Sequence, residues 1–238
     1  MIQTEGIFVG GSAISAPIIG KDFNWTGGDG TYQVLDDGGG NWRIKFLSSG
    51  TFTPLKNMVV DGFLVGGGGA SASSYCGYGG AGYTTTVRSV VLAANTAYPI
   101  VVGAAGTQTY SSQSNGGTSS AFSAVAKGGY RSVSGDKTWR KPGADGGSGG
   151  GGLYADGGID GGDGAKDSDS LATSGGKGQG TTTREFGEAD GDLYASGGGR
   201  NLKATVPNSG NGGYYGGSTS VKPADGIVII RQHKEVAA

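Results

Sequence analysis

The chain has 238 residues, which allows one large domain or two small ones. Glycine supplies 54 of these residues, roughly three times its average share of about 7 %, but no strict Gly-X-Y repeat is present, which excludes a collagen triple helix. With 18 basic and 19 acidic residues the net charge is −1, so the chain lacks the basic excess typical of a nucleic-acid-binding protein.

The numbers of aromatic and cysteine residues, and the start of the chain, narrow the class of protein further. The 3 Trp, 11 Tyr and 7 Phe favour an ordered core over a disordered glycine-rich segment. The single Cys76 excludes an intrachain disulfide. The start "MIQTEGIFVGGSAISAPIIGK" has no basic residue before its apolar stretch, which is not typical of a signal peptide, so we expect synthesis in a cytoplasm without export by the general secretory route. No apolar run of about 18 residues is present, so we expect no membrane insertion.

Residues 1–48 are predicted to form an N-terminal attachment segment. Its apolar start predicts an extended arm that buries itself against something else, such as a partner subunit. "TYQVLDD" (31–37) and "NWRIKFL" (41–47) flank three glycines, which predicts a β-hairpin with a glycine-rich turn. Trp42, Ile44 and Phe46 alternate along the second strand and therefore share one face.

Residues 49–130 carry most of the predicted strands. They are spaced about ten residues apart and separated by Gly and Asn turns, which is typical of an antiparallel sandwich or jelly roll. We therefore expect an all-β fold without substantial helix, with Phe52 of "SGTFTPL" facing inward. The further strands fall within residues 57–66, 82–95, 97–106 and 116–129.

Residues 131–222 hold 27 of the 54 glycines, in clusters that recur every 15–20 residues with Leu, Tyr and Phe between them. A flexible linker has no reason for this spacing. Residues 223–238 then form a closing strand and a tail. Ile227 to Ile230 are four consecutive apolar residues, which predicts burial on both faces, and their expected partner is the apolar strand at 58–65.

The glycine clusters predict polyglycine II helices. Such helices are left-handed, with three residues per turn and a rise of about 3.1 Å. Because glycine has no Cβ, neighbouring helices can approach until backbone N–H groups of one meet carbonyls of the next. Ordering each residue costs about 1–2 kcal/mol of backbone entropy, so the adjoining strands and the interspersed Tyr and Leu must anchor the bundle. The loops between the helices are then free to vary and to bind.

The ordered set "SGTFTPLKNMVVDGFLVGGGG", "GYGGAGYTTTVRSVVLAANTAYPIVVGAAG", "NGGTSSAF" and "GIVIIR" resembles the glycine-rich domain of bacteriophage tail-fibre and tail-tip proteins, from about residue 49 to 231. The resemblance implies a virion receptor-binding adhesin at a tail or fibre tip, whose loops contact a bacterial surface protein or glycan. Residues 1–48 would attach it to another tail or fibre protein. The clusters here are shorter than in such adhesins and are interrupted by acidic residues.

The residues offer little for catalysis, and we expect neither an enzyme nor a cofactor. His233, the only histidine, lies in the tail, and no pair of carboxylates is positioned for glycan hydrolysis. Lys177 is followed by glycine instead of the Ser or Thr of a phosphate-binding loop. "GGDGAKDSD" departs from a calcium repeat at Lys166, and cation binding by the acidic stretch from Asp156 to Asp169 stays open.

Aromatic residues between polar and glycine stretches are the candidate receptor-binding residues, because Tyr, Ser and Gly also dominate antibody loops. The first three are Tyr110 in "TQTYSSQSN", Trp139 in "GDKTWRKPG" and Phe186 in "TTTREFGEADGD". Tyr154, Tyr194 and Tyr214 are further candidates.

Two other functions stay open at this point. One is a structural tail-tip or assembly protein without receptor contact, whose loops would face other subunits. The other is a hydrolase or a calcium-dependent lectin. The oligomeric state is also open, since long fibres are commonly homotrimers whereas a tip adhesin can be a single copy.

Overall fold

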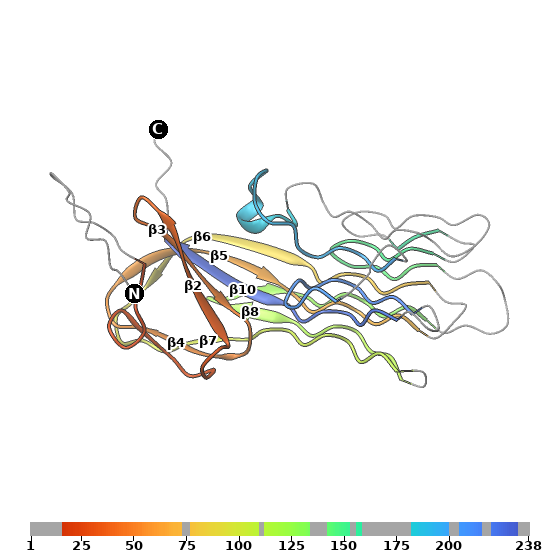
Figure 1. Cartoon of the computed structure of the whole chain (residues 1–238), viewed down its shortest axis with the longest axis horizontal. Coiled ribbons are helices and arrows are strands. Elements are labelled where there is room, and N and C mark those ends of the chain that lie inside the picture. The colour runs from red at the N-terminus through yellow and green to blue at the C-terminus, as the bar shows by residue number, and fades with distance from the viewer. Residues whose placement is uncertain are drawn as a thin grey trace.

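The computed structural model describes residues 16–72, 77–109, 112–133, 142–152, 156–158, 182–199, 205–215 and 220–232. The β-sheets lie at one end of the molecule, and glycine-rich segments extend away from them towards the other end (Figure 1). The described part is all-β with antiparallel pairing, and its helical content is one short 3₁₀ turn, η1 (Glu185–Gly187). The prediction of an all-β fold without substantial helix is confirmed.

The strands form two larger sheets and a small hairpin, all antiparallel. The five-stranded sheet has the order β2 (Tyr32–Gly38), β3 (Asn41–Phe46), β10 (Ile227–Gln232), β5 (Met58–Val65) and β6 (Thr84–Leu92). The three-stranded sheet has the order β1 (Phe23–Trp25), β4 (Gly50–Pro54) and β7 (Tyr98–Ile100). The hairpin pairs β8 (Ser119–Ala121) with β9 (Ala124–Ala126).

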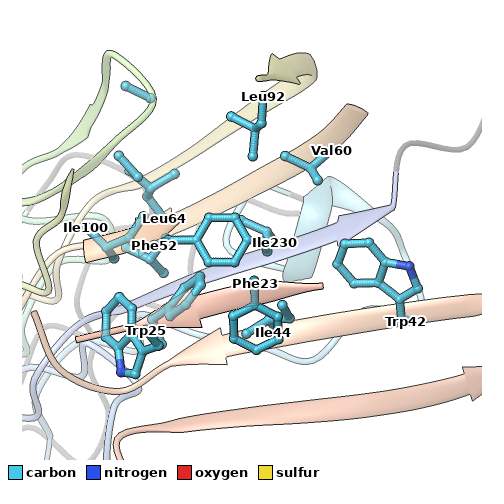
Figure 2. Close-up of a cluster of buried hydrophobic side chains, with 14 of the residues drawn as sticks. Phe23, Trp25, Trp42, Ile44, Phe52, Val60, Leu64, Leu92, Ile100 and Ile230 are labelled. Carbon is cyan, nitrogen blue, oxygen red and sulfur yellow. The ribbon is translucent and has the colours of Figure 1, made fainter. Parts of the chain in front are cut away.

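An aromatic core lies between the two larger sheets (Figure 2). Trp42, Ile44 and Phe46 of β3 are buried while the residues between them are half-buried, so the predicted alternation is confirmed. Phe52 is fully buried, also as predicted. The rings of Trp25 and Phe46 lie 4.7 Å apart, centroid to centroid. Burying each large apolar side chain contributes about 1.5–3 kcal/mol, so this core is the main source of stability of the sandwich.

The closing strand β10 lies in the middle of the five-stranded sheet. Ile227 to Ile230 are all buried, and β10 pairs with β5 through registers such as Ile229 with Phe63, so both predictions are confirmed. Its other neighbour is β3, with Ile230 opposite Ile44. The hairpin of the predicted attachment segment therefore belongs to the same sheet as the glycine-rich part, and the sheet continues across the predicted boundary at residue 48.

Two predicted strands are shorter in the structure. The strand expected at 97–106 ends at Ile100, and the chain leaves the sheet before Gly103. The strand expected at 116–129 is a hairpin that turns at Phe122 and Ser123, both with positive φ. Sequence reasoning missed this turn because neither residue is one of the Gly or Asn residues that usually occupy left-handed positions.

Residues 66–69 show the hydrogen bonding of a polyglycine II helix. The N–H groups of Gly66, Gly67 and Gly68 donate to three different neighbouring segments, and Gly69 returns to the first of them. The acceptors, in order, are the carbonyls of Tyr83, Gly117, Ala224 and Gly80. A helix with three residues per turn directs every third N–H in the same direction, which gives this pattern.

This central helix is surrounded on all sides. Its carbonyls at Gly67, Gly68 and Gly69 accept N–H groups from three further segments. The six surrounding segments are 80–83, 103–106, 114–117, 129–132, 210–213 and the one at residue 224. Around residues 66–70 the bundle therefore has the local hexagonal arrangement of packed polyglycine II helices.

Glycine is required here because it has no Cβ. A Cβ on Gly68 would overlap the backbone carbonyl of Asn211, and one on Gly66 would overlap that of Lys127. Neither glycine has a positive φ, so left-handed backbone is not the reason for glycine at these positions. Where the helices leave more room, larger residues fill it: Tyr78 and Tyr214 are buried with their ring centroids 5.0 Å apart.

Most bundle helices are direct continuations of strands (Figure 1). β5 and β9 run on into the segments beginning at residues 66 and 127, and the segments ending at residues 83 and 226 run on into β6 and β10. Residues 142–152 and 156–158 adjoin no strand. They are joined to the bundle by backbone hydrogen bonds with the 77–83 and 127–133 segments, such as that from Ala81 N–H to the carbonyl of Ser148.

Candidate functional site

Half of the six predicted receptor-binding residues lie outside the described residues: Tyr110, Trp139 and Tyr154. The others, Phe186, Tyr194 and Tyr214, are 2 %, 9 % and 4 % exposed. These three rings pack inside the molecule, and their role in receptor binding stays a prediction. Whether the loops around them bind a receptor stays a prediction.

Phe186 and Tyr194 belong to a segment that covers the outer face of the five-stranded sheet, residues 182–195, called here the cap. Their ring centroids lie 6.1 and 5.6 Å from that of Phe63 on β5. Within the cap, the N–H of Glu185 donates to the carbonyl of Asp192, and that of Tyr194 to the carbonyl of Thr183. The polar residues around Phe186 and Tyr194 thus belong to a hairpin-like segment that buries the rings of these two residues.

Four basic residues of the sheet hold the acidic cap. The buried Glu185 accepts from Arg43 at 2.6 Å and lies 3.3 Å from the Nζ of Lys45. Arg231 pairs with Glu188 at 2.7 Å, and Arg88 donates to the carbonyl of Phe186. These pairs satisfy the charges that the cap brings onto the sheet.

Charge interactions stabilise the cap in its position on the five-stranded sheet. Burial lowers the pKa of Lys45, but the hydrogen bond to Tyr194 and the charge of Glu185 outweigh it, so the pKa of Lys45 is raised. Burial also raises the pKa of Tyr194. The guanidinium of Arg231 lies 4.2 Å from the centroid of the Phe186 ring, a cation–π contact. Phe186 itself has φ of 55°, a strained conformation that these contacts hold.

An open cavity of about 260 Å³ lies between the cap, the β2–β3 turn and the end of β10. Its carboxylates include Asp37 and Glu188, which pair with Arg43 and Arg231. Among the described residues no group of three or more His, Cys, Asp or Glu side chains could hold a metal ion. Of the predicted acidic loop only Asp156 is described, so that loop lies almost wholly outside the described residues.

A second surface lies on the side of the bundle, along the segment 127–133. Lys127, Tyr130, Arg131 and Val133, called here the ridge, are exposed, whereas Gly129 and Ser132 are buried. Tyr130 is 48 % exposed and Val133 66 %. Sequence reasoning did not select Tyr130. The signal that could have found it is the period of three, which places residues 127, 130 and 133 on one side once the segment is recognised as a three-fold helix.

The backbone of the ridge is fixed by its two neighbours. The N–H of Tyr130 donates to the carbonyl of Asp145 at 3.0 Å, and that of Arg131 to the Oδ1 of Asn115 at 2.9 Å. Within the described part of the chain, no hydrogen bond, ion pair or ring contact involves the side chains of Lys127, Tyr130 or Arg131. A rigid backbone therefore carries three side chains available to a ligand.

No helix in the described ranges is long and apolar enough to span a bilayer. A search of curated proteins finds no match to the chain. The sequence model of a family described as glycine-rich domain matches residues 47–233, from just before β4 to just after β10. This range covers the bundle, the cap and most of the strands. The chain therefore belongs to the glycine-rich domain family.

Proposed function

We propose that this protein is a non-enzymatic host-recognition protein at the tip of a bacteriophage tail or tail fibre. It binds a bacterial surface through the loops that join the bundle helices and through the adjoining ridge. It is made in the host cytoplasm, carried in the virion and needs no cofactor.

The observation that carries the proposal is the rigidity of the bundle. The helix at residues 66–70 has hydrogen-bonded neighbours on all sides, and the strands continue directly into several of the helices. Binding residues are disproportionately found on loops positioned by a rigid scaffold, and such a scaffold lowers the entropy cost of holding a recognition surface. The bundle suits this role better than it suits catalysis, because it is built mainly from backbone groups.

Attachment to another tail or fibre protein is assigned to the opposite end, where the predicted attachment segment enters the sandwich. Ile18 and Ile19 are 46 % and 43 % exposed there. Exposed apolar side chains of this kind suit a protein contact. They also support the second candidate function, a structural tail-tip protein that contacts only other subunits.

Binding of fluorescently labelled protein to a panel of bacterial strains, with and without chelator, separates the two candidates. We expect saturable, strain-selective binding that survives chelator and that falls when residues 134–141 are replaced by a Gly/Ser segment of equal length. Lys21→Gln, at an exposed site near Ile18, is the control and leaves binding unchanged. Absence of binding to every strain contradicts the host-recognition function and favours the structural one.

A further inference from the structure

The ridge has a composition suited to one class of ligand. It combines an exposed tyrosine ring with two cationic groups, Lys127 and Arg131, and their side chains have no partner within the described residues. Every other aromatic ring in the described part is buried or half-buried. Tyr and Arg are both among the residue types enriched at binding hot spots.

We propose that the ridge binds an anionic glycan of the bacterial surface, a ligand assignment that rests on the proposed function. The Tyr130 ring offers a flat, amphipathic face for a sugar ring. The Arg131 guanidinium can donate two parallel hydrogen bonds to a carboxylate or a phosphate. Lys127 adds a second positive charge one turn away.

Geometry favours a chain-like ligand. Residues 127, 130 and 133 project from successive turns of a three-fold helix, so their spacing is roughly 9 Å per turn. The backbone bonds to Asp145 and Asn115 fix this spacing before any ligand arrives. A polysaccharide lying along the ridge meets the side chains at 127, 130 and 133 without a change of backbone conformation, and the long side chain of Arg131, on the adjoining face of the three-fold helix, reaches it from the edge.

Other ligand classes fit less well. A stable protein interface buries about 800 Å² on each partner around an apolar centre, whereas the apolar part of the ridge consists of Tyr130 and Val133 alone. Nucleic acid binding needs several cations, because each neutralised phosphate contributes separately to affinity. The ridge has two, on a chain whose net charge is −1. A protein receptor is accordingly an outcome of the test below and not the proposal.

The test uses the full chain on an array of purified bacterial lipopolysaccharides and capsular polysaccharides, both anionic and neutral. We expect binding to anionic members only, weakening as salt is raised. Tyr130→Ala and Arg131→Gln each reduce affinity at least about ten-fold, a loss of about 1.4 kcal/mol. Both side chains are exposed, so thermal unfolding of the variants stays as in the parent chain.

Matched controls and cell binding make each outcome informative. Lys21→Gln removes an equal charge far from the ridge in sequence, and Val91→Ala truncates an exposed apolar residue on β6, so both keep full glycan binding. Binding to no anionic glycan, or equal binding by Tyr130→Ala, overturns the inference. If cells still bind the protein after periodate but not after protease, the receptor is a protein, and the proposed function stands while this inference fails. Failure on the array and on cells together contradicts both.

Discussion

The bundle contains two groups of helices that are held in different ways. The inner helix at residues 66–70 continues β5 without a break and has six hydrogen-bonded neighbours. The outer segments at 142–152, 156–158 and 195–199 continue no strand; they are joined by backbone hydrogen bonds to segments that do, such as those from Ala144 N–H to the carbonyl of Tyr78 and from Gly198 N–H to the carbonyl of Gly79. The inner group is therefore anchored by covalent continuity with the core, whereas the outer group depends on backbone hydrogen bonds to that inner group and, where residues 195–199 follow the cap, on the cap's ion pairs and two buried rings. Strand continuity and hydrogen bonding to helices that are already anchored are alternative ways to offset the entropy cost of ordering glycine.

The largest expected effect comes from adding a methyl group to the inner helix. In Gly68→Ala the new Cβ meets the backbone carbonyl of Asn211, which cannot move without disturbing several hydrogen-bonded segments. We expect a loss of about 5 kcal/mol or more in the free energy of unfolding, enough to abolish cooperative folding. The measurement is chemical denaturation followed by circular dichroism.

Gly38→Ala is the control for that substitution. Gly38 is the last residue of β2, where the chain enters the turn to β3; a Cβ there would have open space but the backbone has φ of +77°. The expected loss is therefore the cost of an L-residue in a left-handed conformation, about 1–2 kcal/mol. A similar loss in both variants would contradict the view that close backbone approach is what requires glycine in the bundle.

An intermediate effect is expected from the cap. Glu185→Gln leaves Arg43 and Lys45 without their shared, buried counter-charge, which costs about 3 kcal/mol. Because residues 195–199 directly follow the cap, hydrogen–deuterium exchange should speed up in the cap and at residues 195–199 while β5 and β10 stay protected. Glu188→Gln, whose side chain is 45 % exposed, should cost less than about 1 kcal/mol. Equal exchange in both groups of helices would show that they unfold as one unit.

The smallest effect is expected from alkaline pH. The folded-state pKa of Lys45 is raised above its ordinary 10.5, and that of Tyr194 above 10.0, so folding favours the protonated form of both. Their contribution is complete below the unfolded pKa values and is lost as pH rises through the folded ones. We expect faster exchange in the cap and at residues 195–199 from about pH 10 upwards. In Tyr194→Phe, which keeps the ring and removes the titrating hydroxyl, this pH dependence should be weaker; an unchanged profile would contradict the assignment.

The sandwich could be predicted because its signals are local. Alternation at Trp42, Ile44 and Phe46 predicted one buried face of β3, and the apolar run at Ile227–Ile230 predicted a strand buried on both faces. The pairing of β10 with β5 was also predictable, because each run needs an apolar partner. The β8–β9 turn was missed because Phe122 and Ser123 adopt left-handed backbone only under tertiary constraint.

The candidate site was less predictable, for a reason seen in single residues. Phe186 is flanked by charged and polar residues in the sequence, yet its ring is buried. Arg43 and Lys45 pair with Glu185, and Arg231 pairs with Glu188, so the charges on either side of the ring are satisfied at the sheet. Tyr130 stands beside two glycines and was passed over, yet it is exposed because its segment lies on the outside of the bundle. At both rings, the polarity of the neighbouring residues in the sequence therefore failed to predict whether the side chain is exposed.

By itself the sequence determined the all-β class, the closing strand and the need for close-packed glycine helices, since periodicity and the missing Cβ act over a few residues. Only the tertiary structure decided which helix is central, which segments depend on the cap and which aromatic rings face solvent. These properties depend on the neighbours of each segment, and a three-fold helix bonds only to other segments. Its neighbours are accordingly set by the path of the whole chain.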